Sequence, residues 1–177
     1  MLLKKLQQIH NTKEAWFFDE SRFGTHSNIG HAWFRKGQRT PVKIKLGYEN
    51  FYLYSAVNSK TGDSFSLMLP KVNTLCMNIF MKEFGKYINN KDITFIMDGA
   101  TGHKSRLLHI PSNIKSIIQP PYSPEVNPVE RLWQYIKHNI SRNRIYETLE
   151  ELENIVCEFL QKLSPETIKS VCSYKYV

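Results

Sequence analysis

Two aspartates and one glutamate stand where a folded chain can bring carboxylates together. Asp19 follows the apolar run 15–18, and Asp98 follows the apolar run 93–97. The sequence contains only four aspartates, so half of them come directly after its two most apolar runs. If these runs are adjacent central strands, their ends meet at one sheet edge, where α/β proteins commonly bind ligands. Glu130, near the start of a predicted helix, can reach the same edge.

Three converging carboxylates would repel one another unless a cation joins them. Oxygen ligands, with no cysteine and little histidine among them, suit Mg²⁺ or Mn²⁺ better than Zn²⁺. Two such ions can activate a nucleophile and stabilise the leaving oxygen of an in-line phosphoryl displacement. These residue types therefore indicate metal-dependent phosphodiester chemistry, and in a basic protein we expect the substrate to be nucleic acid.

Each carboxylate also has a structural interpretation. Asn127-x-x-Glu130 has the spacing of a capping box, in which the glutamate hydrogen-bonds the backbone of the N-cap residue. Asp98-Gly99 is a turn signal, and an aspartate at a strand end often serves only to turn or cap the chain. These alternatives stay open for any single residue, and the combination of three favours the metal site.

A proline-rich segment at 120–126 leads into the helix that carries Glu130. Proline rings fix φ and keep the preceding residues out of the helical region, so this segment should be stiff and extended. Asn127 and Pro128 then have the residue types of an N-cap and a first helical residue. The apolar spacing that follows places Glu130 at the edge of the buried face of the helix.

The remaining patterns predict an α/β fold, with helices packed on a mixed sheet that joins an antiparallel hairpin to parallel strands. We expect residues 1–13 to form a short helix or an arm, and residues 14–177 to form one domain. The predicted elements are a strand at 15–18, a hairpin of 48–57 and 64–69, a helix at 73–88, strands at 93–97 and 114–118, and helices beginning near 128, 149 and 165.

Composition excludes some classes of protein. The chain has 177 residues, 41% of them hydrophobic and 23% charged, which is typical of a globular domain. It has no apolar run long enough for a membrane span and no signal-peptide core, so we expect a cytoplasmic, nucleoid-associated protein, of bacterial type. Three widely spaced cysteines indicate neither a disulfide framework nor a zinc site.

The net charge of +8 is unevenly spread, because residues 147–177 carry −3. Two basic stretches could follow a DNA backbone. The alternative, that they are ordinary solvated surfaces, stays open. The first stretch, beside two aromatic residues, contains Arg35, Lys36, Arg39, Lys43 and Lys45, and the second contains Arg131, Lys137, Arg142 and Arg144.

Several motifs resemble the catalytic domain of the IS630/Tc1/mariner transposases. They are Phe17-Phe18-Asp19-Glu20-Ser21, residues 95–100 with His103, and above all Pro121-Tyr122-Ser123-Pro124-Glu125-Val126-Asn127-Pro128-Val129-Glu130-Arg131-Leu132-Trp133. Residues 30–39 resemble a further stretch of the family, and the similarity covers roughly residues 14–165.

The resemblance implies an RNase H-like fold and a DDE triad of Asp19, Asp98 and Glu130. It implies two Mg²⁺ or Mn²⁺ ions, with Asp19 bridging both and the other two carboxylates each holding one. Water would first attack a phosphodiester at a transposon end, and the freed 3′-hydroxyl would then attack target DNA, typically at a TA dinucleotide. Asp98 and Glu130 lie 32 positions apart, slightly short for the family.

The motifs also suggest supporting residues and partners. His103 could contact the scissile phosphate or orient a carboxylate, whereas Glu20 should point to the opposite strand face from Asp19. The partners implied are double-stranded DNA and a second copy, or a separate DNA-binding region, since we expect the helix-turn-helix of full-length relatives to be absent. Two alternatives stay open: a nuclease that only hydrolyses, and a non-catalytic remnant that binds DNA or a full-length transposase.

Overall fold

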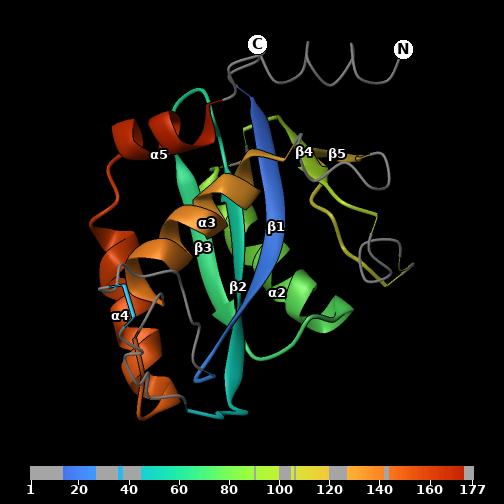
Figure 1. Cartoon of the computed structure of the whole chain (residues 1–177). Helices are drawn as coiled ribbons and strands as arrows, with labels where there is room; N and C mark the ends of the chain where they lie inside the picture. Colours follow the sequence, from blue (N-terminus) through green and yellow to red (C-terminus); the bar gives the residue numbers. More distant parts are fainter. Residues whose placement is uncertain are drawn as a thin grey trace.

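The computed structural model describes residues 14–26, 36–37, 45–89, 91–99, 105, 107–119, 127–141 and 144–173. The arm predicted at residues 1–13 lies outside this set. Within it, a mixed five-stranded sheet is covered by helices on both faces (Figure 1). The predicted α/β architecture is therefore confirmed.

The sheet is built around β1 (Ala15–Gly24), in the order β3-β2-β1-β4-β5. On one side, β1 pairs antiparallel with β2 (Asn50–Val57), which pairs antiparallel with β3 (Ser64–Leu69). On the other side, β1 pairs parallel with β4 (Ile93–Met97), which pairs parallel with β5 (Ile114–Ile118). The predicted hairpin and parallel strands are both present.

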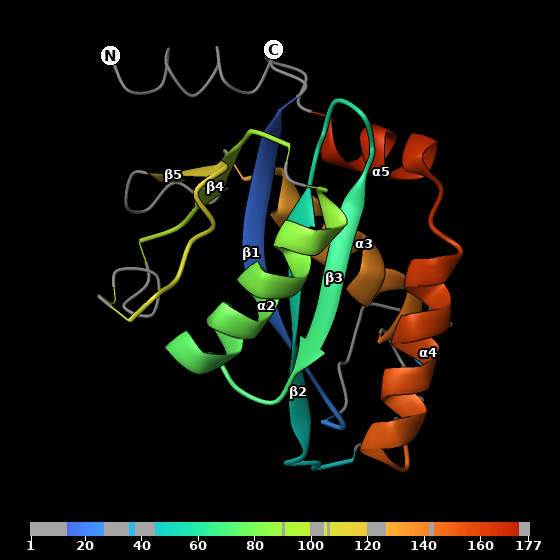
Figure 2. The ribbon, with the colours of Figure 1, turned by 180° about the vertical axis from the view of Figure 1, so that it is seen from behind.

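Four helices cover the sheet, and each begins at an N-cap whose side chain accepts a backbone hydrogen bond. Helix α2 lies on one face, and α3, α4 and α5 lie on the other (Figures 1 and 2). None of the helices in the described ranges is long and apolar enough to cross a membrane. The helices are α2 (Thr74–Tyr87, capped by Asn73), α3 (Pro128–Ile140, capped by Asn127), α4 (Leu149–Gln161, capped by Thr148) and α5 (Pro165–Cys172, capped by Ser164).

Alternate residues of β1 serve two separate cores. Trp16 and Phe18 pack with the aromatic side chains of α2, whereas Phe17 and Phe23 pack with α3. Burying each such aromatic ring contributes about 1.5–3 kcal/mol. The central strand is therefore fixed from both faces, which gives its polar residues a defined direction.

One predicted boundary is wrong. The strand expected at 15–18 continues to Gly24, because β2 pairs with β1 as far as the Gly24–Asn50 pair. Asp19 therefore lies within β1, opposite Ser55 of β2, and not after the strand. The pairing of β1 with β4 does stop early, at Phe17. Asp19 thus lies just beyond the end of the β1–β4 pairing.

Candidate active site

The parallel register of β1 and β4, if continued two residues beyond its last pair, leads to Asp19 on β1 and to Asp98 just after β4. Phe17 of β1 pairs with Ile96 of β4. Two residues further along each strand, the same register reaches Asp19 and Asp98. Phe17 and Ile96 both belong to the core on the α3 side, and side chains two residues apart share a face. Asp19 and Asp98 are therefore placed on the face that α3 covers.

Gln119 extends this row to a third strand. Ile96 pairs with Ile117 of β5, and the Gln119 backbone N–H donates to the Met97 carbonyl at 2.8 Å. Gln119 thus stands beside Asp98 at the same level. The residue is only 6% exposed, and its side-chain nitrogen has no hydrogen-bond partner among the described residues. A buried amide beside this carboxylate row was not found by sequence reasoning.

Helix α3 is attached to β1 at the residue that begins it. The buried Asn127 side chain accepts from the Val129 N–H at 3.1 Å and donates to the Phe18 carbonyl at 3.1 Å. This second bond fixes the first turn of α3 beside Asp19. No hydrogen bond joins the Glu130 carboxylate to the Asn127 backbone within the described residues, so Asn127 alone supplies the side-chain cap. The capping-box interpretation of Glu130 is therefore not supported.

A second contact joins α3 to the row of carboxylates. The indole N–H of Trp133 donates to Asp19 Oδ2 at 2.9 Å. Trp133 is 3% exposed and belongs to the core on this face, as its place on the apolar side of the helix predicted. Glu130 lies one turn before Trp133, on the same side of α3. The helix therefore presents both an indole donor and a carboxylate to Asp19.

Asp19 is in an unfavourable environment for a lone negative charge. Burial raises the pKa of its carboxyl from 3.8 to about 7, with the Trp133 hydrogen bond opposing this and the charges of Glu130 and Glu20 adding to it. Without a cation, Asp19 would carry a proton for about half of the time near neutral pH. A divalent cation would stabilise the ionised form instead. The position thus fits a metal ligand better than a structural aspartate.

Lys137 provides positive charge two turns further along α3. Its ammonium lies 5.4 Å from the centre of the Phe23 ring, in a cation–π arrangement. Burial lowers the pKa of Lys137, while the charges of Glu130 and Asp19 act to raise it. Lys137 therefore lies close enough to Glu130 and Asp19 for their charges to act on it.

Other residues predicted from sequence are placed differently. Lys45 donates to the carbonyls of Tyr146 and Glu147, at 2.9 and 2.6 Å, so it links the segment before β2 to the start of α4. Arg131 donates to the Ser173 carbonyl at the end of α5. The Lys45 ammonium and the Arg131 guanidinium therefore both make contacts within the chain. Their role in DNA binding stays a prediction.

The roles predicted for the remaining residues stay predictions. Glu20 pairs with Tyr54 of β2, and alternation places it on the α2 face, away from Asp19. Lys36 is exposed. Outside the described residues lie His103, Arg35, Arg39 and Lys43.

The donor set was also tested for its fit to a metal ion. Carboxylate oxygens from β1, the end of β4 and the start of α3 are the ligands that Mg²⁺ and Mn²⁺ prefer. Across the described residues, no three Asp, Glu, His or Cys side chains are close enough to form a metal-binding group. Asp19 and Glu130 influence one another electrostatically, whereas Asp98 is exposed at the end of β4. The residue types therefore fit Mg²⁺ or Mn²⁺, and a bound cation would have to draw the three carboxylates closer together.

Comparisons with known proteins agree with this geometry. A family model described as DDE superfamily endonuclease matches residues 14–153. An uncharacterised protein of Sinorhizobium fredii is 33% identical over 63% of this chain and 84% of its own length. The 39 kDa protein of insertion element IS630 from Shigella sonnei is 31% identical over 92% of this chain and 49% of its own. The Tc3 transposase of Caenorhabditis elegans is 24% identical over 91% of this chain and 53% of its own.

Solved structures show the same fold. The mariner Mos1 paired-end complex with Mg superposes with a TM-score of 0.76, at 13% identity, and covers 97% of this chain and 55% of the Mos1 chain. The Mos1 strand transfer complex gives a TM-score of 0.74. The fold is therefore RNase H-like, as the resemblance implied. This chain spans about half the length of the IS630 and Tc3 relatives. It belongs to the DDE superfamily endonucleases, within the IS630/Tc1/mariner group.

Proposed function

From its membership of this endonuclease family, we propose that the chain is the catalytic domain of a DNA transposase. It would cut a phosphodiester at the transposon end and join the freed 3′-hydroxyl to target DNA at a TA dinucleotide. One observation supports the proposal: Asp19 and Asp98 each lie two residues beyond the last β1–β4 pair, and Asn127 attaches the helix bearing Glu130 beside Asp19. In the proposed active state, these three separated segments would each supply one carboxylate.

Asp19, Asp98 and Glu130 would hold two Mg²⁺ or Mn²⁺ ions. Such ions supply activation of the attacking oxygen and stabilisation of the leaving oxygen. Burial of Asp19 and the negative charges of Glu130 and Glu20 near it support this assignment, because a cation would relieve the cost of ionising it. Mos1 complexes with Mn and with Mg are among the structures of similar fold.

The partner of the domain would be double-stranded DNA, at transposon ends and at the target. Mos1 was solved in a paired-end complex with a transposon end, and this chain shares its fold. We also propose that the active assembly contains two copies of the chain, or the chain with a DNA-binding region. Lys137, near the carboxylates, and Lys36, on the surface, are the described members of the basic stretches best placed to meet DNA.

A strand-transfer assay tests the proposal. The chain is incubated with a donor duplex carrying free 3′-hydroxyl ends, a TA-containing plasmid and Mn²⁺, and joined products are counted and sequenced. Asp98→Asn and Glu130→Gln should each lower joining about a hundredfold or more, since a lost metal ligand costs several kcal/mol of transition-state stabilisation. Asp92→Asn, at an exposed aspartate before β4, is the matched control and should retain full activity.

The outcomes separate the proposal from its rivals. Nicking without joining would indicate a nuclease that only hydrolyses. DNA binding with neither reaction, even in the presence of a supplied DNA-binding region, would indicate a non-catalytic remnant. Joining that persists in Asp98→Asn would reject the assignment of the site. Glu130→Gln should leave the free energy of unfolding almost unchanged, because Asn127 supplies the helix cap.

A further inference from the structure

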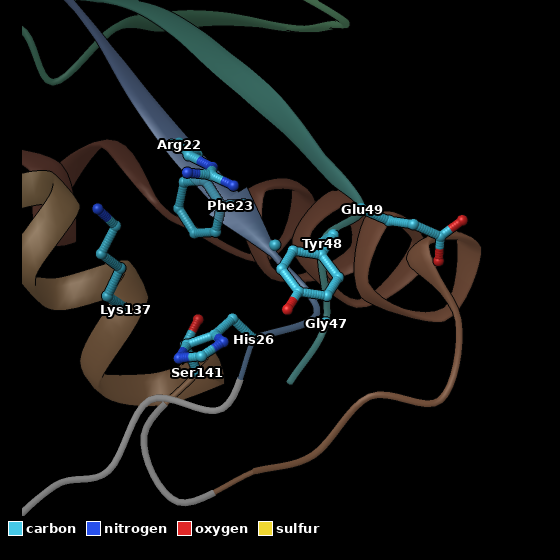
Figure 3. Close-up of a pocket in the computed structure, with 9 residues that line it drawn as sticks. Arg22, Phe23, His26, Gly47, Tyr48, Glu49, Lys137 and Ser141 are labelled. Atoms are coloured by element: carbon cyan, nitrogen blue, oxygen red, sulfur yellow. The ribbon is translucent and has the colours of Figure 1, made fainter. Parts of the chain in front are cut away.

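A cavity of about 400 Å³ opens at the far end of β1 from Trp16, between the ends of β1 and β2 and helix α3 (Figure 3). Proteins hold single small ligands in cavities of about 300–1,000 Å³, so this one matches a nucleotide and is too small for a duplex. Its walls come from three segments that are far apart in sequence. The lining residues are Arg22, Phe23, Gly24, His26, Gly47, Tyr48, Glu49, Lys137 and Ser141.

The floor of the cavity is held by a close backbone contact. The Thr25 N–H donates to the Glu49 carbonyl at 3.1 Å. A Cβ added to Gly47 would overlap Thr25, and one added to Gly24 would lie 2.9 Å from the Glu49 carbonyl oxygen. Only glycine allows the two segments to approach in this way. The cavity is therefore formed by the fold itself and not by the chance position of a side chain.

The side chains around the opening favour an anion. Arg22 from β1 and Lys137 from α3 supply positive charge from two different elements. In Figure 3, His26 lies beside Ser141, below Phe23, whereas the Glu49 carboxylate extends away from the other side chains. The Lys137 ammonium lies over the Phe23 ring, which holds it at the cavity wall. A phosphate group would meet the Lys137 cation on the α3 side, with Arg22 at the strand end that borders the cavity.

Tyr48 supplies an aromatic surface at the same opening. The residue is 85% exposed, which leaves its ring faces to solvent. Its backbone is nevertheless positioned, because the Asn50 side chain donates to the Tyr48 carbonyl at 3.1 Å. Exposed rings beside cations are the combination with which proteins bind unpaired nucleotides, by stacking the base and pairing the phosphate.

The cavity lies at a defined distance from the carboxylates. Phe23 is four residues after Asp19 on β1, which corresponds to about 13 Å along a strand. Lys137 is seven residues after Glu130 on α3, or about 10 Å along a helix. DNA rises about 3.4 Å per nucleotide along each strand, so the two paths span about three to four nucleotides.

We propose that this cavity binds one unpaired nucleotide of the DNA strand, about three to four nucleotides from the phosphodiester held at Asp19, Asp98 and Glu130. The base stacks on Tyr48, and its phosphate lies beside Lys137. The inference rests on the proposed function, because it takes the strand at the carboxylates to be DNA. It adds a place where the substrate must leave the duplex.

Photo-crosslinking and binding test the proposal without requiring cleavage. DNA carrying 5-iodouracil in a short unpaired stretch is irradiated with the chain in EDTA, and the adducts are mapped by mass spectrometry. The expected adduct is at Tyr48. Tyr48→Ala should weaken binding of partly unpaired DNA about 5- to 100-fold, the range expected for one base–aromatic stack, and leave fully paired DNA almost unaffected. Tyr48→Phe should behave as the parent.

Leu46→Ala is the matched control, since Leu46 is also exposed, at 69%, and does not line the cavity. Adducts only at other residues, or an equal loss of paired and unpaired DNA in Tyr48→Ala, would overturn the inference. The inference would also be overturned if free thymidine monophosphate, added at the same concentration as the DNA, competed away the Tyr48 adduct. That result would indicate a site for a mononucleotide. A Tyr48 adduct without strand joining by the parent would instead count against the proposed function alone.

Discussion

Replacing Asp19 by asparagine should stabilise the metal-free domain at neutral pH, although it removes a proposed metal ligand. The pKa of Asp19 is raised from 3.8 to about 7, mainly by burial. Between these two values the folded chain holds a proton that the unfolded chain releases. The free energy of unfolding therefore falls as pH rises through this window, by up to about 4 kcal/mol at ~1.36 kcal/mol per unit. Asparagine has no charge to bury and can still accept from Trp133.

The measurement is the difference in unfolding free energy between Asp19→Asn and the parent, taken in EDTA at pH 5 and at pH 8. The constant effects of the substitution cancel between the two pH values. The difference should grow by about 2–3 kcal/mol in favour of the variant, because two of the three units fall between pH 5 and 7. For a domain of this size that is roughly 5–10 °C in melting temperature.

Two controls sharpen the result. Asp92→Asn, at an exposed aspartate, should show the same difference from the parent at both pH values. Added Mn²⁺ should stabilise the parent more at pH 8 than at pH 5 and should stabilise Asp19→Asn little, because the cation competes with the proton for Asp19. A parent–variant difference that is identical at pH 5 and pH 8 would refute the claim that Asp19 is protonated in the folded, metal-free chain.

Three further substitutions test the surroundings of Asp19. Trp133→Phe keeps an aromatic ring but loses the N–H donor to Asp19, so we expect the pKa of Asp19 to rise. In a pH–rate profile, the increase of Mn²⁺-dependent activity with pH should then occur at higher pH. Asn127→Ala loses both the cap and the bond to β1 and should cost about 2–3 kcal/mol by urea unfolding, against about 1 kcal/mol for the exposed cap Thr148→Ala. Gln119→Met removes a buried amide whose nitrogen lacks a partner among the described residues, and should raise the free energy of unfolding by about 1 kcal/mol; a loss of stability would show that the amide nitrogen is bonded.

The elements that the sequence predicted well are those whose signals are local. The strand Ile93–Met97 has the predicted limits and the helix Pro128–Ile140 the predicted start, since an apolar run ends at Asp98 and an N-cap with proline begins the helix. β1 was predicted too short, because the polar residues after Phe18 resemble the end of a strand. The hydrogen bonds that β2 supplies to them are tertiary, and no local pattern reports them.

The site required information of a kind that a single sequence lacks. Asp19 and Asp98 were identified by their position after apolar runs, but their shared level depends on the β1–β4 register, and residue types do not encode register between distant strands. Trp133 shows the same limit, because its spacing correctly predicted burial and contained no sign of the hydrogen bond to Asp19.

Asn127 attaches the helix that bears Glu130 to the sheet without using the Glu130 carboxylate. Folding of this region and the proposed catalysis therefore use different side chains. The asparagine caps α3 and bonds the β1 carbonyl beside Asp19, and the Trp133–Asp19 hydrogen bond adds a second contact between the helix and β1. The Glu130 carboxylate takes no part in this attachment, and Asp19 opposes folding when it is ionised. A bound cation would stabilise the ionised Asp19 carboxylate, so the carboxylate would then contribute to metal binding. A metal-dependent site requires residues such as Asp19, which destabilise the metal-free fold. It also requires neighbours such as Asn127, which hold the site in place without binding the metal.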